Sequence, residues 1–354
     1  MNRAELLQWL TETDPERLGW LWGQADAVRR QQVGDEVHLR GLLETSSHCV
    51  RHCLYCGLRA PNRDLPRYRM TAEEILAGAR LATDLGYGTV VLQSGEDPGL
   101  TEDFVAGIIR RIKAETRLAV TLSLGERSVE ELAAWRAEGA DRYLLRFETS
   151  NAQLYAAVHP SLPGRPSDRI ALLGQLRELG YEIGSGVMIG IPGQTFEDLA
   201  DDLEWFARLD LDMIGVGPFI PHPATPLGQE AGRFQVCNQV PNDEEMTCKV
   251  MALARRICPA ANIPATTALA TLNRRNGMEL GLTRGGNVVM PNLTPAVYRS
   301  RYDIYPEKAC IQEAQPKCLD GFEHGIIRLG RRIGQGRGDS ANYLRRRTAA
   351  SRKT

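Results

Sequence analysis

Three cysteines stand close together in one short segment of the sequence. Cys49, Cys53 and Cys56 are spaced C-x3-C-x2-C within SSHCVRHCLYCG, residues 46–57. Cysteine thiolates are the usual protein ligands of iron–sulfur clusters, so three of them at this spacing can hold one face of a cluster. A [4Fe–4S] cluster would keep one iron free to chelate a small molecule through an amino and a carboxylate group. The spacing therefore predicts a cluster-binding loop with a small-molecule site beside it.

Structural zinc is the alternative for such a segment. His48 and His52 stand beside the cysteines, and either could supply a fourth zinc ligand. Structural zinc sites, however, usually pair two short Cys/His hairpins, and no second C-x2-C follows in this sequence. The spacing favours an iron–sulfur cluster over zinc.

Composition narrows the class of protein. The chain has 354 residues, 43% of them hydrophobic and 25% charged, which is typical of a globular protein. Its net charge of −1 gives no overall field that would attract nucleic acid or membranes. No apolar run approaches the roughly 20 residues of a membrane span, and the charged N-terminus does not resemble a signal peptide. The eight cysteines do not suggest a small secreted disulfide framework. We expect a cytoplasmic protein without a nucleic-acid or membrane partner.

Expected strands and helices alternate along most of the chain. The expected strands cover residues 37–44, 89–94, 118–124, 143–147, 183–191, 213–220, 263–269 and 287–291. The expected helices between them cover residues 71–86, 103–113, 129–138, 168–179, 195–209 and 243–257. Alternation over about 250 residues predicts an α/β fold with parallel strands, a (β/α)8 TIM-type barrel. A doubly wound open sheet is the alternative.

The barrel defines three parts of the chain. Residues 1–35 form an expected N-terminal helical segment, residues 36–292 the barrel, and residues 293–354 a C-terminal extension. The extension ends in a basic stretch that includes Arg345, Arg346, Arg347, Arg352 and Lys353. We expect this end to be solvated and partly flexible rather than an RNA-binding tail.

Polar motifs follow the expected strands at one end of the barrel, where barrel enzymes carry their chemistry. The cysteine segment follows the first strand, and Ser94-Gly95-Glu96 ends the second. Gly95 would let the backbone approach a ligand closely. Arg146 and Glu148 end the fourth strand, and alternation places both on one side of it. This charged pair could bind a cofactor, or it could bridge loops as an ion pair.

Other segments carry weaker signals. GSGVMIG, residues 184–190, lacks the G-x-G-x-x-G spacing of dinucleotide sites. Its glycines could instead let an adenine ring lie against the strand, with Met188 and Ile191 as apolar walls. Thr266 and Thr267, at an expected strand end, could bind a polar substrate or simply reflect β-propensity. His222, between two prolines, is the histidine we would test for catalysis.

Over nearly its whole length the sequence resembles the HydE family, the [FeFe]-hydrogenase maturases among the radical S-adenosylmethionine (SAM) enzymes. The cysteine spacing, with Tyr55 before the third cysteine, is similar to the superfamily signature. The longer similar stretches are CLYCGLR at 53–59, VLQSGEDP at 91–98, VTLSLGE at 120–126, ADRYLLR at 140–146, GPFIPHP at 217–223, NIPATTA at 262–268 and VMPN at 289–292.

The resemblance implies a full barrel with a [4Fe–4S] cluster on Cys49, Cys53 and Cys56 and with SAM at its mouth. It implies SAM contacts from Tyr55, Gln93, Ser94, Gly95, Ser123, Arg146, Glu148, Arg169 and Met188. It implies a substrate cavity lined by Thr121, Thr266, Thr267, Met290, Tyr302 and Tyr305.

The resemblance also implies a reaction and its partners. SAM would be cleaved reductively to methionine and a 5′-deoxyadenosyl radical, which would attack a small iron-carbonyl-cyanide or cysteine-derived substrate. Companion hydrogenase maturases and an electron donor would be the partners.

Two positions depart from the family pattern. Phe147 stands where the family often has histidine, which would remove a polar group beside the cofactor. Gly321 stands where many members have a third cysteine of an accessory cluster. Because only Cys310 and Cys318 remain there, we predict that a second cluster is absent or labile.

Three other functions stay open. A methylornithine-synthase-like mutase would use a similar barrel without a second cluster. A biotin-synthase-like sulfur insertase would need cysteine inside the barrel, but no cysteine lies between Cys56 and Cys237. A non-catalytic iron–sulfur or zinc carrier would bind metal without cleaving SAM.

Overall fold

The core of the protein is a closed ring of parallel strands. The computed structural model describes residues 1–230, 232, 236–309 and 315–351, with only the backbone described for residues 315–321, 350 and 351. Parallel pairing joins, in this order, β1 (Glu36–Ser46), β2 (Thr89–Ser94), β3 (Ala119–Ser123), β4 (Arg142–Leu144), β5 (Glu182–Ser185) and β7 (Met213–Ile214).

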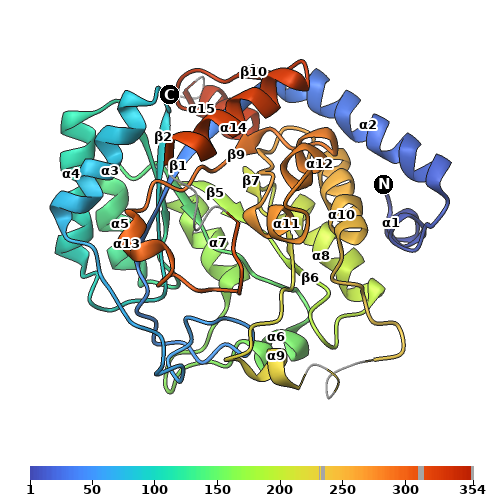
Figure 1. The fold of residues 1–354 in the computed structure, drawn as a ribbon, viewed down its shortest axis with the longest axis horizontal. Coiled ribbons are helices and arrows are strands. Elements are labelled where there is room, and N and C mark those ends of the chain that lie inside the picture. The colour runs from blue at the N-terminus through green and yellow to red at the C-terminus, as the bar shows by residue number, and fades with distance from the viewer. Residues whose placement is uncertain (231, 233–235, 310–314, 352–354) are drawn as a thin grey trace.

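Single bridges complete the ring. Met213 pairs with Asn262 and Pro264 with Val288, both in parallel. The short strand β9 (Val288–Val289) then pairs with β1. The predicted α/β barrel is thereby confirmed, with helices around the strands (Figure 1).

Glycines break two of the predicted strands. Residues 183–191 form β5 and β6 (Met188–Ile189), and residues 213–220 form β7 and β8 (Gly217–Pro218). A Cβ atom on Gly186, between β5 and β6, would lie only 1.7 Å from the carbonyl oxygen of Gly215. Only glycine fits where the two backbones come this close. Beyond the break, β6 and β8 pair as a separate two-stranded sheet.

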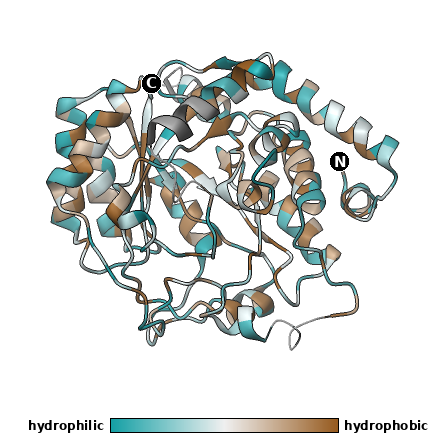
Figure 2. Cartoon of the chain, in the orientation of Figure 1, coloured by the Kyte–Doolittle hydropathy of each residue, from teal (hydrophilic) through white to brown (hydrophobic). Residues whose placement is uncertain are grey.

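The helices around the barrel begin where the sequence predicts. They are α3 (Ala72–Asp84), α4 (Glu102–Glu115), α5 (Val129–Ala137), α7 (Arg169–Glu178), α8 (Phe196–Arg208) and α10 (Glu244–Ile257). A Ser, Thr or Asp side chain accepts a backbone N–H at the start of each. Each helix buries apolar residues toward the strands, and Figure 2 shows hydrophobic and hydrophilic residues alternating around them.

The N-terminal segment forms two helices, as predicted. α1 (Arg3–Leu10) and α2 (Pro15–Val33) lie against α8 and α10, outside the ring of strands. Leu6, Leu10 and Leu21 are buried in the main hydrophobic core. Their apolar stripe is therefore used for packing within the chain.

The predicted seventh strand was wrong in its second half. α11 (Thr267–Leu272) occupies residues that were expected to extend the strand to position 269. Thr266 is the N-cap of this helix, and its hydroxyl accepts the N–H of Leu269. A threonine hydroxyl suits a helix start as well as a strand, so the two threonines begin a helix rather than end a strand.

The remaining elements connect and cover this framework. They are α6 (Ala152–Val158), α9 (Pro226–Gln229), α12 (Gly277–Thr283), α13 (Ala296–Arg299), α14 (Gln315–Arg328), β10 (Arg332–Ile333) and α15 (Ala341–Ser351). β10 extends the sheet by pairing with the start of β1. Figure 1 shows β10 at one end of the barrel and α6 and α9 among the loops at the other.

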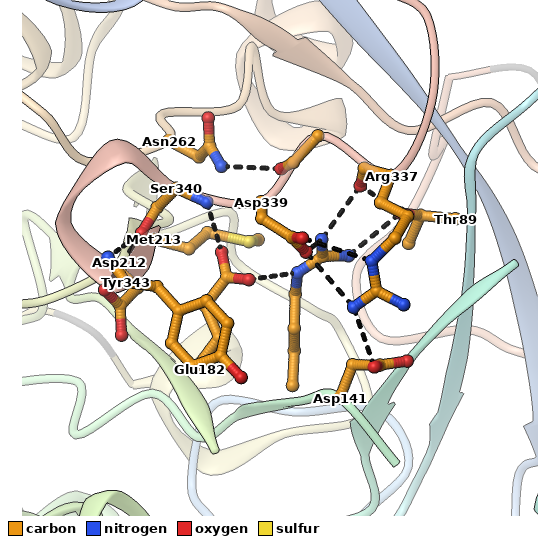
Figure 3. Close-up of polar contacts among 12 residues, drawn as sticks. Thr89, Asp141, Glu182, Asp212, Met213, Asn262, Arg337, Asp339, Ser340 and Tyr343 are labelled. Carbon is orange, nitrogen blue, oxygen red and sulfur yellow. Dashed lines mark hydrogen bonds and ion pairs between the residues drawn. The ribbon is translucent and has the colours of Figure 1, made fainter. Parts of the chain in front are cut away.

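The C-terminal extension closes the barrel at the amino ends of its strands (Figure 3). Arg142 donates to Glu182 at 2.6 Å and to the carbonyl of Arg337 at 2.8 Å, and it also pairs with Asp339. The backbone N–H of Ser340 donates to Glu182 at 3.0 Å. These contacts hold residues 337–340 across the base of the barrel.

The extension continues as α15 along the same base. Arg346 pairs with Asp210 and with the buried Asp212, and Tyr343 is buried. Arg346 therefore lies against the barrel, whereas Arg345 and Arg347 are exposed, as expected for this end. No helix in the described parts of the chain is both long and apolar enough to cross a membrane.

Candidate active site

A cavity opens where the cysteine loop crosses the carboxyl ends of the strands. Its volume is about 180 Å³. Ten of the residues predicted to hold the cluster and SAM line it: Cys49, Cys53, Tyr55, Cys56, Ser94, Gly95, Ser123, Arg146, Glu148 and Arg169. The structure thus brings side chains from the first four strand ends and from α7 around one space.

The cysteine loop is fixed to the loop that follows β2. The N–H of Val50 donates to the carbonyl of Glu96 at 2.9 Å, and the N–H of Gly95 donates to the carbonyl of Ser46 at 3.1 Å. A Cβ atom on Gly95 would lie 2.3 Å from the carbonyl oxygen of His48 and 2.8 Å from the Cβ of Cys49. Glycine at this position therefore permits close packing of the two loops.

A buried arginine ties the cysteine loop to two carboxylates. Arg51, whose side chain is 3% exposed, lies 2.9 Å from Glu96 and 2.9 Å from Glu126. Glu126 also accepts a hydrogen bond from Arg169 at 2.9 Å. Because these charges are paired away from water, the network restrains the loop that carries the cysteines.

The chemistry of the three thiols fits an iron–sulfur cluster. Desolvation raises the pKa of Cys53 to about 12 and also raises the pKa values of Cys49 and Cys56. The metal-free thiols are therefore protonated at neutral pH, and metal binding would release those protons. Soft sulfur donors select iron–sulfur clusters, zinc or copper(I) over hard cations.

The arrangement counts against a zinc site. Within the described ranges, no three His, Cys, Asp or Glu side chains are grouped so that they could hold a metal ion. His52 is exposed, and neither His48 nor His52 is among the residues that line the cavity. A cluster offers a different iron to each cysteine, so the three sulfurs need not meet at one ion.

Arg146 and Glu148 both line the cavity. The expected strand over residues 143–147 was wrong at its end, because β4 stops at Leu144 and the two residues lie in the loop that follows. Arg146 Nη2 lies 3.2 Å from a carboxylate oxygen of Glu148. Glu148 has a φ of 64°, in the left-handed region that is uncommon outside glycine. The surrounding backbone holds it there, since its N–H donates to the carbonyl of Gly186 and its carbonyl accepts from Met188. Strain of this kind is often found at functional sites.

Phe147 points elsewhere. It is buried, with its ring centroid 5.8 Å from that of Phe206. It lines a neighbouring cavity rather than the one at the cysteines. The expectation that phenylalanine at this position removes a polar group beside the cofactor is not supported by this placement.

Two residues predicted to contact SAM lie behind the cavity lining. The Gln93 amide donates to the Tyr302 hydroxyl at 3.3 Å. Met188 belongs to a small apolar cluster against which Leu54 and Tyr55 pack; its other members are Val158, Ile191, Phe219 and Leu227. This cluster provides an apolar surface next to the cysteine loop.

Residues predicted to line a substrate cavity are divided between two places. Thr266, Thr267 and Met290 line a second, smaller cavity of about 50 Å³. Tyr302 lines the cysteine cavity, and its ring lies 5.1 Å from the Lys308 ammonium of the second cavity. Tyr302 therefore connects the two spaces.

The other two predicted substrate residues, Thr121 and Tyr305, line neither cavity; Thr121 is buried and Tyr305 is half-buried. The Thr121 hydroxyl is buried and has no hydrogen-bond partner within the described structure. Strand alternation places it on the same face of β3 as Ser123, which lines the cysteine cavity. Burial raises the pKa of Tyr305, whose hydroxyl forms a hydrogen bond with the side chain of Thr271.

An ion pair in the second cavity was not predicted from the sequence. Lys308 Nζ lies 2.6 Å from Glu44, and Asn292 donates to the same carboxylate at 3.0 Å. Glu44 stands in β1, whereas Lys308 and Asn292 follow it by 264 and 248 positions in the sequence. Only the closure of the barrel brings them together.

The histidine at the cavity is His159, which the sequence did not indicate. Its Nδ1 lies 3.0 Å from the sulfur of Cys53, and burial with the charge of Arg169 lowers its pKa to about 4. His222, which we expected to test for catalysis, lines neither cavity. Its Nε2 lies 2.9 Å from Asp303, and its Nδ1 accepts the N–H of Ala224. His159 has no motif spacing to the cysteines, so only the fold could identify it.

Cys310 lies outside the described residues, and the side chains of Cys318 and Gly321 are not described. The predicted absence of a second cluster therefore stays a prediction.

Comparison with known proteins gives a consistent assignment. The model of the radical SAM superfamily matches residues 43–206. The chain is 47% identical over 315 residues to the [FeFe] hydrogenase maturase subunit HydE of Thermotoga maritima. The aligned region covers 89% of this chain and 87% of that protein. It is 30% identical over 285 residues to 3-methylornithine synthase of Methanosarcina barkeri. That alignment covers 79% of this chain and 76% of the synthase.

A solved structure shows the same fold. Methylornithine synthase (PylB) superposes with a TM-score of 0.80 at 23% identity, covering 94% of each chain. The closed barrel and the three loop cysteines agree with the similarity in sequence. The chain is a radical SAM enzyme and belongs to the family of the [FeFe]-hydrogenase maturase subunit HydE.

Proposed function

We propose that this enzyme takes part in assembling the diiron active-site cofactor of [FeFe]-hydrogenase. One observation carries the proposal: the three cysteines open onto a single cavity with Ser94, Arg146 and Glu148, in a chain 47% identical to HydE. The bound [4Fe–4S] cluster and SAM supply the chemistry, which is reductive cleavage of SAM to methionine and a 5′-deoxyadenosyl radical.

The residues around the cysteine cavity would bind and orient SAM. Cys49, Cys53 and Cys56 would each ligate one iron, and the free iron would face the cavity. The loop at Ser94 and Gly95 offers a carbonyl to the SAM ammonium, and Arg146 with Glu148 offers charged groups to its carboxylate and ribose. The remaining proposed SAM contacts are Tyr55, Gln93, Ser123, Arg169 and Met188.

The small apolar cluster would hold the adenine ring. Met188 and Tyr55 meet in that cluster beside the cysteine loop. Apolar walls with few polar groups are usual where a ring system is bound. The barrel then shields the reacting carbon from water and oxygen.

The substrate would lie deeper in the barrel. The proposed lining consists of Thr121, Thr266, Thr267, Met290, Tyr302 and Tyr305. The unpartnered hydroxyl of Thr121 offers a hydrogen-bond donor, and the Lys308–Glu44 pair at the second cavity offers fixed charges. Such groups suit a small polar substrate like an iron-carbonyl-cyanide or cysteine-derived compound. Companion hydrogenase maturases and an electron donor complete the proposed partners.

Thr121→Val is expected to separate stability from substrate binding. Removing a buried hydroxyl that has no partner should leave the protein as stable or about 1 kcal/mol more stable. Losing a hydrogen bond to substrate should lower substrate-dependent turnover by about 2- to 10-fold. Thermal melting and turnover with substrate measure the two effects. A marked loss of stability with normal turnover would show that the hydroxyl has a structural role instead.

The reconstituted protein is expected to bind one cluster. A single [4Fe–4S] cluster corresponds to about four irons per chain, because the third tail cysteine is replaced by Gly321. Iron and sulfide analysis after anaerobic reconstitution measures this. A content of about eight irons would contradict the prediction, since it would require a second four-iron cluster.

A 3-methylornithine synthase is the second candidate, because PylB shares the fold at a TM-score of 0.80. A biotin-synthase-like reaction is less compatible, because no described cysteine other than the three of the loop lines either cavity. A metal carrier remains as the non-catalytic alternative.

Complementation distinguishes these functions. The gene is expressed in a hydrogenase-producing host that lacks its own HydE-type maturase, with the Cys56→Ala variant as control. Hydrogen production restored by the wild type alone supports the proposal. Accumulation of 3-methylornithine without restored hydrogenase would support the second candidate. If a protein with a full cluster gave neither of these two results, the metal-carrier alternative would be supported.

A further inference from the structure

His159 is held against one of the cysteines by the end of a helix. It follows α6 directly, and its N–H donates to the carbonyl of Tyr155 at 2.7 Å. Its ring stacks on that of Tyr155, with the centroids 5.0 Å apart. The residue is 1% exposed. With backbone and ring both fixed, Nδ1 lies 3.0 Å from the sulfur of Cys53.

The other ring nitrogen determines where the proton lies. Nε2 is 3.2 Å from Nη2 of Arg169. A guanidinium can donate hydrogen bonds but cannot accept them, whereas the Glu126 carboxylate, 3.4 Å from Nε2, can only accept. Arg169 is the closer of the two partners, which makes Nε2 the acceptor in the neutral ring. The single proton of the neutral ring is then on Nδ1, which faces Cys53. A doubly protonated ring also carries a proton on Nδ1, so this nitrogen is a donor in either state.

Arg169 is itself fixed. It donates to Glu126 at 2.9 Å and to the carbonyl of Arg146 at 2.7 Å. Glu126 also lies 3.4 Å from Nε2 of His159 and 2.9 Å from Arg51. The same network that restrains the cysteine loop therefore orients the histidine.

A cysteine that ligates iron has lost its proton, so its sulfur can only accept a hydrogen bond. Hydrogen bonds to the sulfurs are among the determinants of a cluster's reduction potential. A donor stabilises the reduced cluster more, because reduction adds negative charge that the sulfurs share.

We propose that His159 donates a hydrogen bond from Nδ1 to the iron-ligating sulfur of Cys53 and thereby raises the reduction potential of the cluster. The inference rests on the proposed function, since it requires the cluster on the three cysteines. His159 is a positioning residue in this role, because it acts on the cluster through Cys53. The Tyr55 hydroxyl, at 3.4 Å from Nδ1, is the more distant partner.

Two isosteric replacements separate the two ring nitrogens. In His159→Asn, the amide nitrogen can take the place of Nδ1 and keep the donor toward Cys53. In His159→Gln, the amide nitrogen takes the place of Nε2 and leaves Cys53 without a donor. His38→Asn is the matched control: its side chain stands near the base of the barrel, where it faces Gly334 and Gly338.

The measurement is an EPR-monitored redox titration of the anaerobically reconstituted proteins, without SAM. Relative to wild type, His159→Gln is expected to show an about tenfold lower ratio of reduced to oxidised cluster at a fixed solution potential, equivalent to about 59 mV for one electron. His159→Asn and His38→Asn are expected to titrate like the wild type. Circular dichroism and iron content confirm that each variant is folded and loaded.

Three results would overturn the inference. A wild-type potential in His159→Gln, with an intact cluster, would show that the hydrogen bond has no influence. An equal shift in the Asn and Gln variants would remove the role of Nδ1. If the wild type gave no [4Fe–4S] EPR signal at all, both the proposed function and this inference would be overturned. This result differs from the first two, in which the cluster signal is present.

Discussion

Replacing Cys56 by alanine is expected to abolish SAM cleavage and to prevent stable cluster assembly. Cys56 is one of three cysteines that line the same cavity, and each ligates a different iron in the proposed site. Without it a second iron would lack a protein ligand, so the cluster would be lost or would expose two open irons. Formation of 5′-deoxyadenosine should fall to the level of a reaction without enzyme, and iron content should fall with it.

Cys237→Ala is the matched control. Cys237 is exposed and free, so its replacement should change stability by less than about 0.5 kcal/mol and leave SAM cleavage intact. The visible spectrum, iron content and 5′-deoxyadenosine yield are measured for both variants. Normal product formation by Cys56→Ala would show that the cluster is held differently.

Arg142→Met is expected to destabilise the folded chain by about 3–5 kcal/mol, the usual effect of removing one partner from a buried ion pair. The Arg142 side chain is 3% exposed and that of Glu182 is 1% exposed. Methionine fills a similar volume, but it leaves the buried Glu182 without the guanidinium that pairs with it at 2.6 Å. It also removes the donor to the carbonyl of Arg337, and with it part of the attachment of the C-terminal segment.

An exposed pair provides the comparison for this effect. Arg80 lies 2.7 Å from Glu115, with the two side chains 47% and 32% exposed. Arg80→Met should therefore change the free energy of unfolding by less than about 1 kcal/mol. Urea denaturation of the metal-free proteins, followed by circular dichroism, measures both variants. If Arg142→Met and Arg80→Met were equally stable, the contacts of Arg142 at the base of the barrel would not stabilise the fold as we expect.

The sequence predicts the framework because local signals agree with the final fold. Capping residues such as Thr71, Ser128 and Thr195 mark helix starts, and the structure begins each helix directly after them. The apolar runs between helices predict strands, and their carboxyl ends bring the loop cysteines, Ser94 and Glu148 to one cavity. The meeting of these residues at one end of the barrel follows from the order of the strands.

The features that the sequence did not predict depend on long-range contacts. The Arg142–Arg337 contact spans 195 residues, and that between Cys53 and His159 spans 106. No local periodicity encodes either pair. The helix start at Thr266 was missed for another reason, because a threonine before alternating apolar residues is compatible with a strand as well as with a helix cap.

The central claim is that this barrel cleaves SAM through a cluster on Cys49, Cys53 and Cys56. The most direct test is to incubate the anaerobically reconstituted wild-type protein with SAM and dithionite and to quantify 5′-deoxyadenosine and methionine. We predict that both products form in equal amounts. A protein with a complete [4Fe–4S] cluster that forms neither product, with or without the proposed substrate, would contradict the account.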